Sequence, residues 1–235
     1  MYGNEIRLLG AEAKKYGIDL SEHQLGLFQI YLDELWEWNQ RTNLTGLSDR
    51  KRIAFELFLD SLIPAPFLAQ RGALLDVGTG AGFPGIPLKI YNPHLVVHLL
   101  DANFKKGSFL RQAVRLLGVN ETTVITERIE KAEDSLLPEG YHIITSRALA
   151  RFDQALTWCA PKLAPGGLFV GYLGRRAEAE LREYQGIIDE HNLVLHECIS
   201  YVLPGIGSKR MAVIFKNKDD RVPSSVVSQK QLPSS

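Results

Sequence analysis

Short apolar runs alternate with helical patterns from residue 73 onward. The runs contain few polar residues, and they lie at 73–77, 95–100, 123–126, 142–145 and 168–172. Candidate helices lie between and after them, at 85–91, 105–117, 152–159 and 176–191. Strands that lack polar alternation are buried on both faces, as in a parallel sheet that helices cover on both sides. The pattern therefore predicts an α/β fold with a doubly wound sheet.

The two flanks of this region differ from it. Segments 193–199 and 211–215 are strand candidates with only a turn-rich stretch between them, so they should pair antiparallel as the reversed end of the sheet. Residues 1–70 show helical spacing, with Ser21 as a candidate N-cap and a further helix at 49–62 that ends before Pro64. We therefore expect a helical extension at 1–70, a main domain at 71–216 and a disordered tail at 217–235.

Charge and composition exclude several classes of protein. Lys plus Arg and Asp plus Glu both number 27, so the chain cannot coat nucleic acid by bulk charge, although a local basic face is compatible with this balance. No leader and no run of about 18 apolar residues is present, which predicts a cytoplasmic protein without membrane contact. The two cysteines cannot form a disulfide framework, and no Cys/His spacing suits a metal.

A glycine-rich turn follows the first predicted strand. Asp76 ends the strand, and Gly78, Gly80 and Gly82 follow at alternate positions. Glycines permit positive φ and let a ligand approach the backbone closely. In a doubly wound sheet this turn lies at the carboxyl ends of the strands, where nucleotide-like ligands bind.

Two ligands suit this turn. Residues 80–85 fit the G-x-G-x-x-G dinucleotide pattern, whereas residues 76–82 read Asp-x-Gly-x-Gly-x-Gly and resemble the first motif of S-adenosylmethionine-dependent methyltransferases. A carboxylate at Asp76 suits the ammonium and sulfonium cations of S-adenosylmethionine. Asp101, at the end of the second strand, can accept hydrogen bonds from ribose hydroxyls of either ligand. An adenosine-containing ligand is predicted, and the choice between the two stays open here.

A longer run of residues is similar to one family. Residues 75–88, which include Gly-Phe-Pro-Gly-Ile-Pro, resemble the signature of the bacterial RsmG (GidB) proteins, and residues 43–45 and 146–150 agree with it. The resemblance covers roughly residues 20–216 and implies a Rossmann-like class I methyltransferase fold with S-adenosylmethionine as cofactor. It implies methylation at N7 of a guanine in the 530 loop of 16S rRNA, guanine 527 in the family.

The resemblance also implies which residues form the site. Gly78, Phe83, Ile129, Glu130 and Arg147 correspond to cofactor contacts. Asp101 is implied for the ribose by the wider methyltransferase pattern, with Asp76, Gly80 and Gly82 as supporting positions of the loop.

The chemistry at N7 requires no general base. Guanine N7 has a free lone pair and no proton, so the enzyme must supply alignment, which is worth about 7–11 kcal/mol. We therefore assign no catalytic base. Arg147 suits the guanine O6 or the cofactor carboxylate, because its planar fork matches both acceptors. A purely structural pairing of Arg147 with Asp153 is the alternative.

RNA contact should come from local groups of cations. The candidates are Lys105, Lys106, Arg111 and Arg115 on one predicted helix, Arg151 after the fourth strand, Arg175 and Arg176 after the fifth, and Lys209 and Arg210 in the terminal hairpin. Each group alone also fits an ordinary solvated face. We expect a monomer that acts on 16S rRNA, free or within an assembling small subunit, and not on DNA. An NAD(P)-dependent oxidoreductase and a non-catalytic nucleotide-binding module of ribosome assembly remain alternatives.

Overall fold

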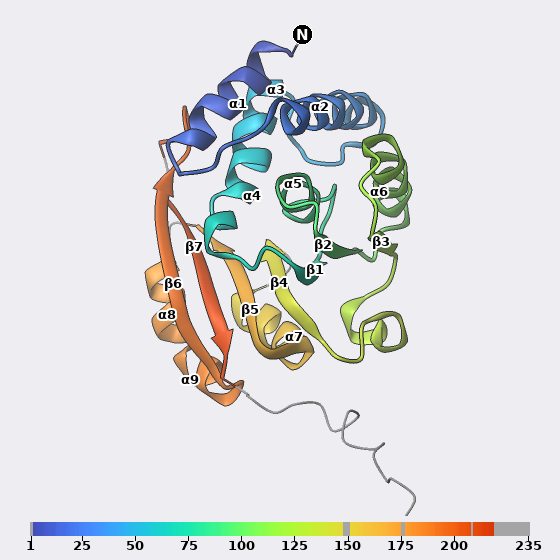
Figure 1. Cartoon of the computed structure of the whole chain (residues 1–235). Coiled ribbons are helices and arrows are strands. Elements are labelled where there is room, and N and C mark those ends of the chain that lie inside the picture. Colours follow the sequence, from blue (N-terminus) through green and yellow to red (C-terminus); the bar gives the residue numbers. More distant parts are fainter. Residues whose placement is uncertain (1, 148–150, 175–176, 208, 219–235) are drawn as a thin grey trace, which may run out of the picture.

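A seven-stranded mixed sheet runs through the computed structural model, which describes residues 2–147, 151–174, 177–207 and 209–218 (Figure 1). The strand order is β3-β2-β1-β4-β5-β7-β6. The strands are β1 Gly72–Val77, β2 Leu95–Leu100, β3 Thr122–Ile125, β4 Tyr141–Arg147, β5 Leu163–Leu173, β6 Leu193–Val202 and β7 Lys209–Asn217. Strands β1 to β5 are parallel, and β7 lies antiparallel between β5 and β6. The predicted doubly wound sheet with a reversed strand is confirmed.

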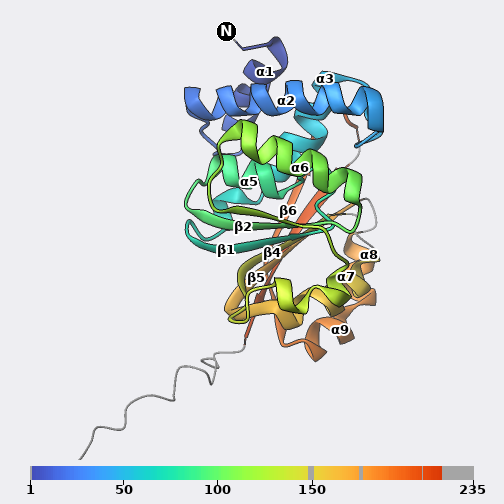
Figure 2. The same ribbon diagram turned by 90° about the vertical axis from the view of Figure 1, so that its right-hand side faces the viewer.

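Helices cover both faces of the sheet (Figure 2). One face is covered by α5 Gly85–Tyr91 and α6 Phe104–Leu117, and the other by α7 Phe152–Cys159, α8 Ala177–Glu183 and α9 Gln185–Glu190. Short 3-10 turns lie at η2 Ala65–Phe67, η3 Ile129–Lys131, η4 Glu133–Ser135 and η5 Ala160–Lys162. The predicted apolar strands are thus covered by helices on both faces of the sheet.

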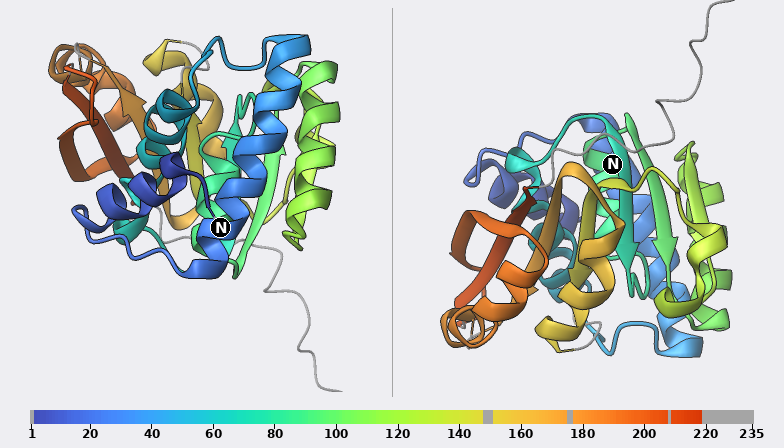
Figure 3. Two further views of the ribbon diagram at one scale, coloured as in Figure 1. Left: turned by 90° about the horizontal axis from the view of Figure 1, so that it is seen from above. Right: turned by 90° about the horizontal axis from the view of Figure 1, so that it is seen from below.

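The N-terminal helices lie on the same face of the sheet as α5 and α6, partly over these helices and partly on β5, β6 and β7, and we call them the N-terminal layer. They are α1 Asn4–Lys14, α2 Glu22–Thr42, α3 Arg50–Ile53 and α4 Asp60–Leu62, and α2 lies alongside α6 (Figure 3). The predicted Ser21 cap is confirmed, since Ser21 and Gln24 form a reciprocal capping box. Phe28 and Phe58 of this layer belong to the same hydrophobic cluster as Leu74 and Val97 of the sheet. The extension therefore packs as part of the core.

Two predicted helices differ in the structure. The helix expected over 49–62 contains a π-helical segment, η1 Ala54–Leu59, between α3 and α4. The helix expected over 176–191 is interrupted at Tyr184, which separates α8 from α9. A π turn is a common local insertion at functional sites, and hydrophobic spacing alone does not reveal it.

The ends of the last strands also differ from the prediction. β5 begins at Leu163, because Leu163 pairs with Tyr141 before a bulge resets the register at Ile143. Asn217, expected as the first residue of a disordered tail, is instead the last residue of β7 and is buried. The remainder of that expected tail, 219–235, lies outside the described residues.

The strand order reverses direction between β1 and β4. From β1 the chain continues toward β2 and β3, whereas β4 leads away toward β5. Asp76 is in register with Thr145 and Val77 with Ser146, so the two strands end side by side. In such sheets a crevice opens at the carboxyl ends of these two strands.

Candidate functional site

The glycine loop lies at the carboxyl end of β1 and rests on the end of β2. Gly78, Gly80 and Gly82 have φ of 70°, 61° and 97°, values that favour glycine. The amides of Gly78 and Thr79 both donate to the carbonyl of Leu100, at 2.8 and 3.0 Å. The loop is therefore fixed to the neighbouring strand by its own backbone, as the alternating glycines predicted.

Asp76 supports the loop from beneath. Its carboxylate is fully buried and accepts hydrogen bonds from Thr79 Oγ1 at 2.5 Å, Gly85 N at 2.8 Å and Thr145 Oγ1 at 2.9 Å. The sequence analysis expected Asp76 to face the cations of S-adenosylmethionine, but the carboxylate points inward and is occupied by these three donors. We therefore assign Asp76 to holding the shape of the loop.

Burial of Asp76 makes stability depend on pH. It raises the pKa of the carboxyl from 3.8 to about 6, against the opposing effect of its hydrogen bonds. Because the pKa is higher in the folded chain, the proton favours folding, and the free energy of unfolding should fall as pH rises from about 4 to 6. We expect urea denaturation to show Asp76→Asn equal to the wild type near pH 4 and about 2–3 kcal/mol more stable at pH 7. A difference that does not vary with pH would contradict this.

Asp101 meets the glycine loop at the end of β2. Its Oδ2 accepts from Gly80 N at 2.9 Å, and its Oδ1 accepts from Asn103 N at 2.8 Å. Lys106 Nζ of α6 lies 3.7 Å from Oδ2. The glycine loop and Asp101, which together predicted an adenosine-containing ligand, are thus in direct contact.

The N-terminal layer supports the other side of the loop. The Tyr31 hydroxyl of α2 donates to the carbonyl of Ala81. The Phe83 ring is buried, with its centroid 5.4 Å from that of Tyr31 and 5.7 Å from that of Phe58. Phe83 therefore presents its backbone, and not its ring, to the crevice. The role of Tyr31 was missed because its helical spacing indicated only a core position.

Ile129 and Glu130 follow β3, as the sequence order required. Both belong to η3, where Ile129 is buried in the core cluster of the opposite face and Glu130 is exposed. Nearby, the Thr126 hydroxyl accepts from Arg111 Nη1 of α6 at 3.2 Å. This segment borders the far side of Asp101 and α6.

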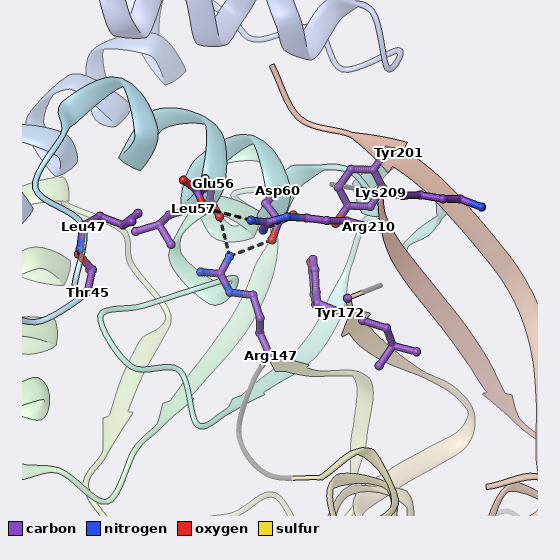
Figure 4. Close-up of a pocket in the computed structure, with 12 residues that line it drawn as sticks. Thr45, Leu47, Glu56, Leu57, Asp60, Arg147, Tyr172, Tyr201, Lys209 and Arg210 are labelled. Carbon is purple, nitrogen blue, oxygen red and sulfur yellow. Dashed lines mark hydrogen bonds and ion pairs between the residues drawn. The ribbon is translucent and has the colours of Figure 1, made fainter. Parts of the chain in front are cut away.

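Arg147 belongs to a buried ionic network that the sequence did not reveal. Its Nη1 lies 3.1 Å from Asp60 Oδ2 and donates to the Glu56 carbonyl at 3.3 Å (Figure 4). Its guanidinium carbon lies 5.6 Å from the Phe83 ring centroid. The alternative pairing with Asp153 is wrong, because Asp153 pairs with Arg151 at 3.0 Å.

Asp60 joins distant parts of the chain within this network. It is 2% exposed, and its Oδ1 accepts from Tyr201 at 2.8 Å and lies 3.2 Å from Arg210 Nη1. Arg210 also lies 3.1 Å from Glu56 Oε2. An acidic residue inside the apolar segment 53–63 could have indicated this network, because a buried acid is rare unless it is paired with a cation.

A cavity of about 470 Å³ lies beside this network (Figure 4). Arg147, Tyr172 and Arg210 line it from the sheet, and Glu56, Leu57 and Asp60 line it from the N-terminal layer. It combines a planar cation and aromatic rings with buried carboxylates. Such a lining suits a planar polar ligand.

The predicted RNA-contacting cations differ in where they lie and in whether they form ion pairs. Lys105, Lys106, Arg111 and Arg115 lie on α6, with Lys106 bordering Asp101. Lys209 pairs with Glu178 and Arg151 with Asp153, whereas Arg210 is committed to the buried network. Arg175 and Arg176 lie outside the described residues. Among these cations, Lys106 lies beside the glycine loop.

The described residues contain neither a candidate metal site nor a candidate membrane span. No group of three or more His, Cys, Asp or Glu side chains there is placed to hold a metal ion. None of the helices in that part of the chain has the length and apolar character needed to cross a membrane.

Comparison with known proteins gives one family and one fold. A family model described as GidB, rRNA small subunit methyltransferase G, matches residues 24–202. A protein named ribosomal RNA small subunit methyltransferase G from Chloroflexus aggregans is 37% identical over 92% of both chains. One of the same name from Acetivibrio thermocellus is 34% identical over 89% of this chain and 87% of its own.

Solved structures share the fold at low identity. A putative O-methyltransferase from Klebsiella pneumoniae matches with a TM-score of 0.59 at 17% identity, covering 80% of this chain and 90% of its own. M. jannaschii TYW2 in complex with AdoMet matches with a TM-score of 0.54 at 15% identity, covering 67% and 74%. These matches confirm the class I methyltransferase fold expected from the sequence.

Proposed function

The chain belongs to the family of rRNA small subunit methyltransferase G, and on that premise we propose that it uses S-adenosylmethionine to methylate N7 of a guanine in the 530 loop of 16S rRNA. Membership makes it an S-adenosylmethionine-dependent methyltransferase of small-subunit rRNA. This sets aside the NAD(P)-dependent oxidoreductase. The acceptor atom, the loop and the residue roles below are the finer part of the proposal.

The contact between the glycine loop and Asp101 carries the proposal. The 2.9 Å bond from Gly80 N to Asp101 Oδ2 brings both adenosine-binding features to one crevice. A Cβ built at Gly80 meets nothing nearer than 3.8 Å, so this side of the loop is open. Each carboxylate oxygen has two lone pairs, so Asp101 can also accept the ribose hydroxyls. Both features support binding of S-adenosylmethionine at this end of the sheet.

The remaining cofactor contacts follow from where the side chains lie. Gly78, Gly80 and Phe83 would offer their backbone carbonyls, because their amides already donate within the protein. Gly82 would shape the loop. Ile129 and Glu130 would flank the adenine through the segment that they form after β3. Arg147 would hold the cofactor carboxylate or the guanine O6. Bound there, S-adenosylmethionine supplies a methyl group on a positively charged sulfur.

Catalysis in this site consists of orientation. Guanine N7 is already a free nucleophile, so no side chain has to remove a proton. Asp60 holds Arg147 from one side and the Phe83 ring supports its guanidinium from another, so Arg147 enters the cavity with a fixed direction. Fixed polar groups of this kind align the acceptor for in-line displacement at no reorganisation cost.

A methyl-transfer assay tests the function. The chain is incubated with labelled S-adenosylmethionine and with small subunits or 16S rRNA from cells that lack this protein, and the product is located by mass mapping. We expect one methyl group on a guanine of the 530 loop, together with calorimetric binding of S-adenosylmethionine and not of NADH. Comparing free rRNA with assembling subunits identifies the true substrate.

Other results would contradict specific parts of the proposal. Label on a guanine outside the 530 loop would contradict the proposed target loop. Label on another atom of the guanine would contradict N7 as the acceptor atom. Cofactor binding without transfer to either substrate would favour the non-catalytic assembly module.

A further inference from the structure

An exposed aromatic side chain stands at the start of α6, beside the glycine loop. Phe104 is 72% exposed, more than any other large apolar side chain in the described part of the chain. It is the first residue of α6, after the N-cap Asn103, whose side chain accepts from the amides of Lys105 and Lys106. The cap fixes the backbone here, so the position of the ring is set by a rigid helix end.

Cations surround this ring. Lys105 and Lys106 follow it directly, the first turn of α6 contains no acidic residue, and the guanidinium carbon of Arg111 lies 5.8 Å from the ring centroid. Arg111 is in turn fixed to Thr126. An aromatic ring among cations is complementary to a nucleic-acid strand, because the cations meet phosphates while the ring meets a base.

The first turn of α6 also adjoins the glycine loop. Lys106 lies 3.7 Å from Asp101, which itself contacts Gly80 of the loop. Gly107, next along α6, lets the helix approach the segment after β3, since a Cβ there would lie 2.5 Å from Thr126 Oγ1. The start of α6 therefore forms one wall of the carboxyl edge of the sheet, where the acceptor strand must pass.

We propose that Phe104 is a stacking platform for an unpaired base of the rRNA strand that carries the acceptor guanine, with Lys105 and Arg111 contacting the adjoining phosphates. This rests on the proposed function for the identity of the RNA, and it adds a binding residue outside the cofactor and acceptor positions. Stacking is tolerant of sequence, because every base has an aromatic face. Phe104 thus contributes to RNA affinity and orients the bound RNA strand. The acceptor guanine is selected by other residues.

Substitution of Phe104 tests the platform in the full chain. Fluorescence anisotropy with a labelled rRNA fragment that contains the 530 loop should show a loss of affinity in Phe104→Ala of roughly 5- to 150-fold, the range for one stacked base. The affinity for S-adenosylmethionine should not change. Phe104→Trp should bind RNA as the wild type does, because it keeps an aromatic ring. RNA should quench the fluorescence of this variant more than that of the wild type, because the added indole would stack on a base. The salt dependence of Phe104→Ala should match the wild type, because no phosphate contact is lost.

Phe67 provides the matched control. It is a second exposed phenylalanine, 44% exposed, in η2 before β1, at the opposite edge of the sheet. Phe67→Ala should bind RNA as the wild type does. RNA affinity of Phe104→Ala within twofold of the wild type would overturn the proposal. Weaker binding to small subunits together with unchanged binding to deproteinised RNA would overturn it in favour of a ribosomal-protein contact. Failure of the wild type to methylate RNA that it binds would count against the proposed function alone.

Discussion

Replacing Gly82 by alanine is expected to lower the free energy of unfolding by about 2–5 kcal/mol and to abolish binding of S-adenosylmethionine. Gly82 has φ of 97°, where an L-residue is strained by about 1–2 kcal/mol. A Cβ there would lie 2.5 Å from Ile86 Cδ1 and 2.6 Å from the Tyr31 hydroxyl, and overpacking adds about 1–3 kcal/mol. Relief requires the buried Ile86 and Tyr31 side chains to shift, which disturbs the hydrogen bond of Tyr31 to Ala81 and the shape of the loop. Urea denaturation and calorimetry measure the two effects.

Gly80 in the same loop supplies the control. Its φ is also positive, but a Cβ there meets nothing nearer than 3.8 Å. Gly80→Ala should therefore lower the free energy of unfolding only by the backbone strain, and the variant should stay folded. Its methyl group would enter the open side of the loop and should lower the affinity for S-adenosylmethionine at least tenfold. Equal stability losses in the two variants would show that the packing around Gly82 has been misjudged. Unimpaired cofactor binding by Gly80→Ala would place the ligand elsewhere.

Arg147→Ala should lower kcat/KM for methyl transfer by roughly 150- to 25,000-fold. Hydrogen bonds to charged groups are each worth about 1.5–3 kcal/mol, and Arg147 is placed to make two with the cofactor or the guanine. Asp60 keeps Tyr201 and Arg210 as partners in this variant, so the chain should remain folded. A single-turnover assay on small subunits measures the rate, and thermal unfolding checks the fold.

Two variants separate the role of Arg147 from its charge. Arg147→Lys keeps the charge and loses the planar fork, so it should recover only part of the rate. Arg182→Ala removes an exposed arginine of α8 and should leave the rate unchanged. Wild-type kcat/KM in Arg147→Ala would assign the residue to structure alone.

The fold was largely predictable because its strands and helices carry local signals. Continuous apolar runs, the Ser21 cap and the missing helix before residue 211 identified the sheet, its layers and the reversed strand. The π turn over Ala54–Leu59 and the break at Tyr184 were not predictable, since both depend on packing between elements. The early start of β5 was hidden by Pro165 and Gly166, which normally indicate a turn.

The site was predictable only where contacts follow chain order. Asp101 beside the glycine loop is a consequence of neighbouring strand ends, and the alternating pattern was enough to place it. The partners of Arg147 were not predictable, because Glu56 and Asp60 lie far away in the sequence. Asp76 was misread for a related reason: the motif gives its position on the strand but not the direction of its carboxylate.

The ionic network around Asp60 has a consequence for synthesis of the chain. It joins Glu56 to Arg210, which are separated by 154 positions. A ribosome must add Arg210 before the two can meet, and contacts between such distant positions close late because the intervening chain must be ordered first. A nascent chain that stops short of Arg210 therefore leaves Asp60 and Glu56 without this partner. Methylating competence should appear abruptly once Arg210 has been added, and not grow in proportion to the length made.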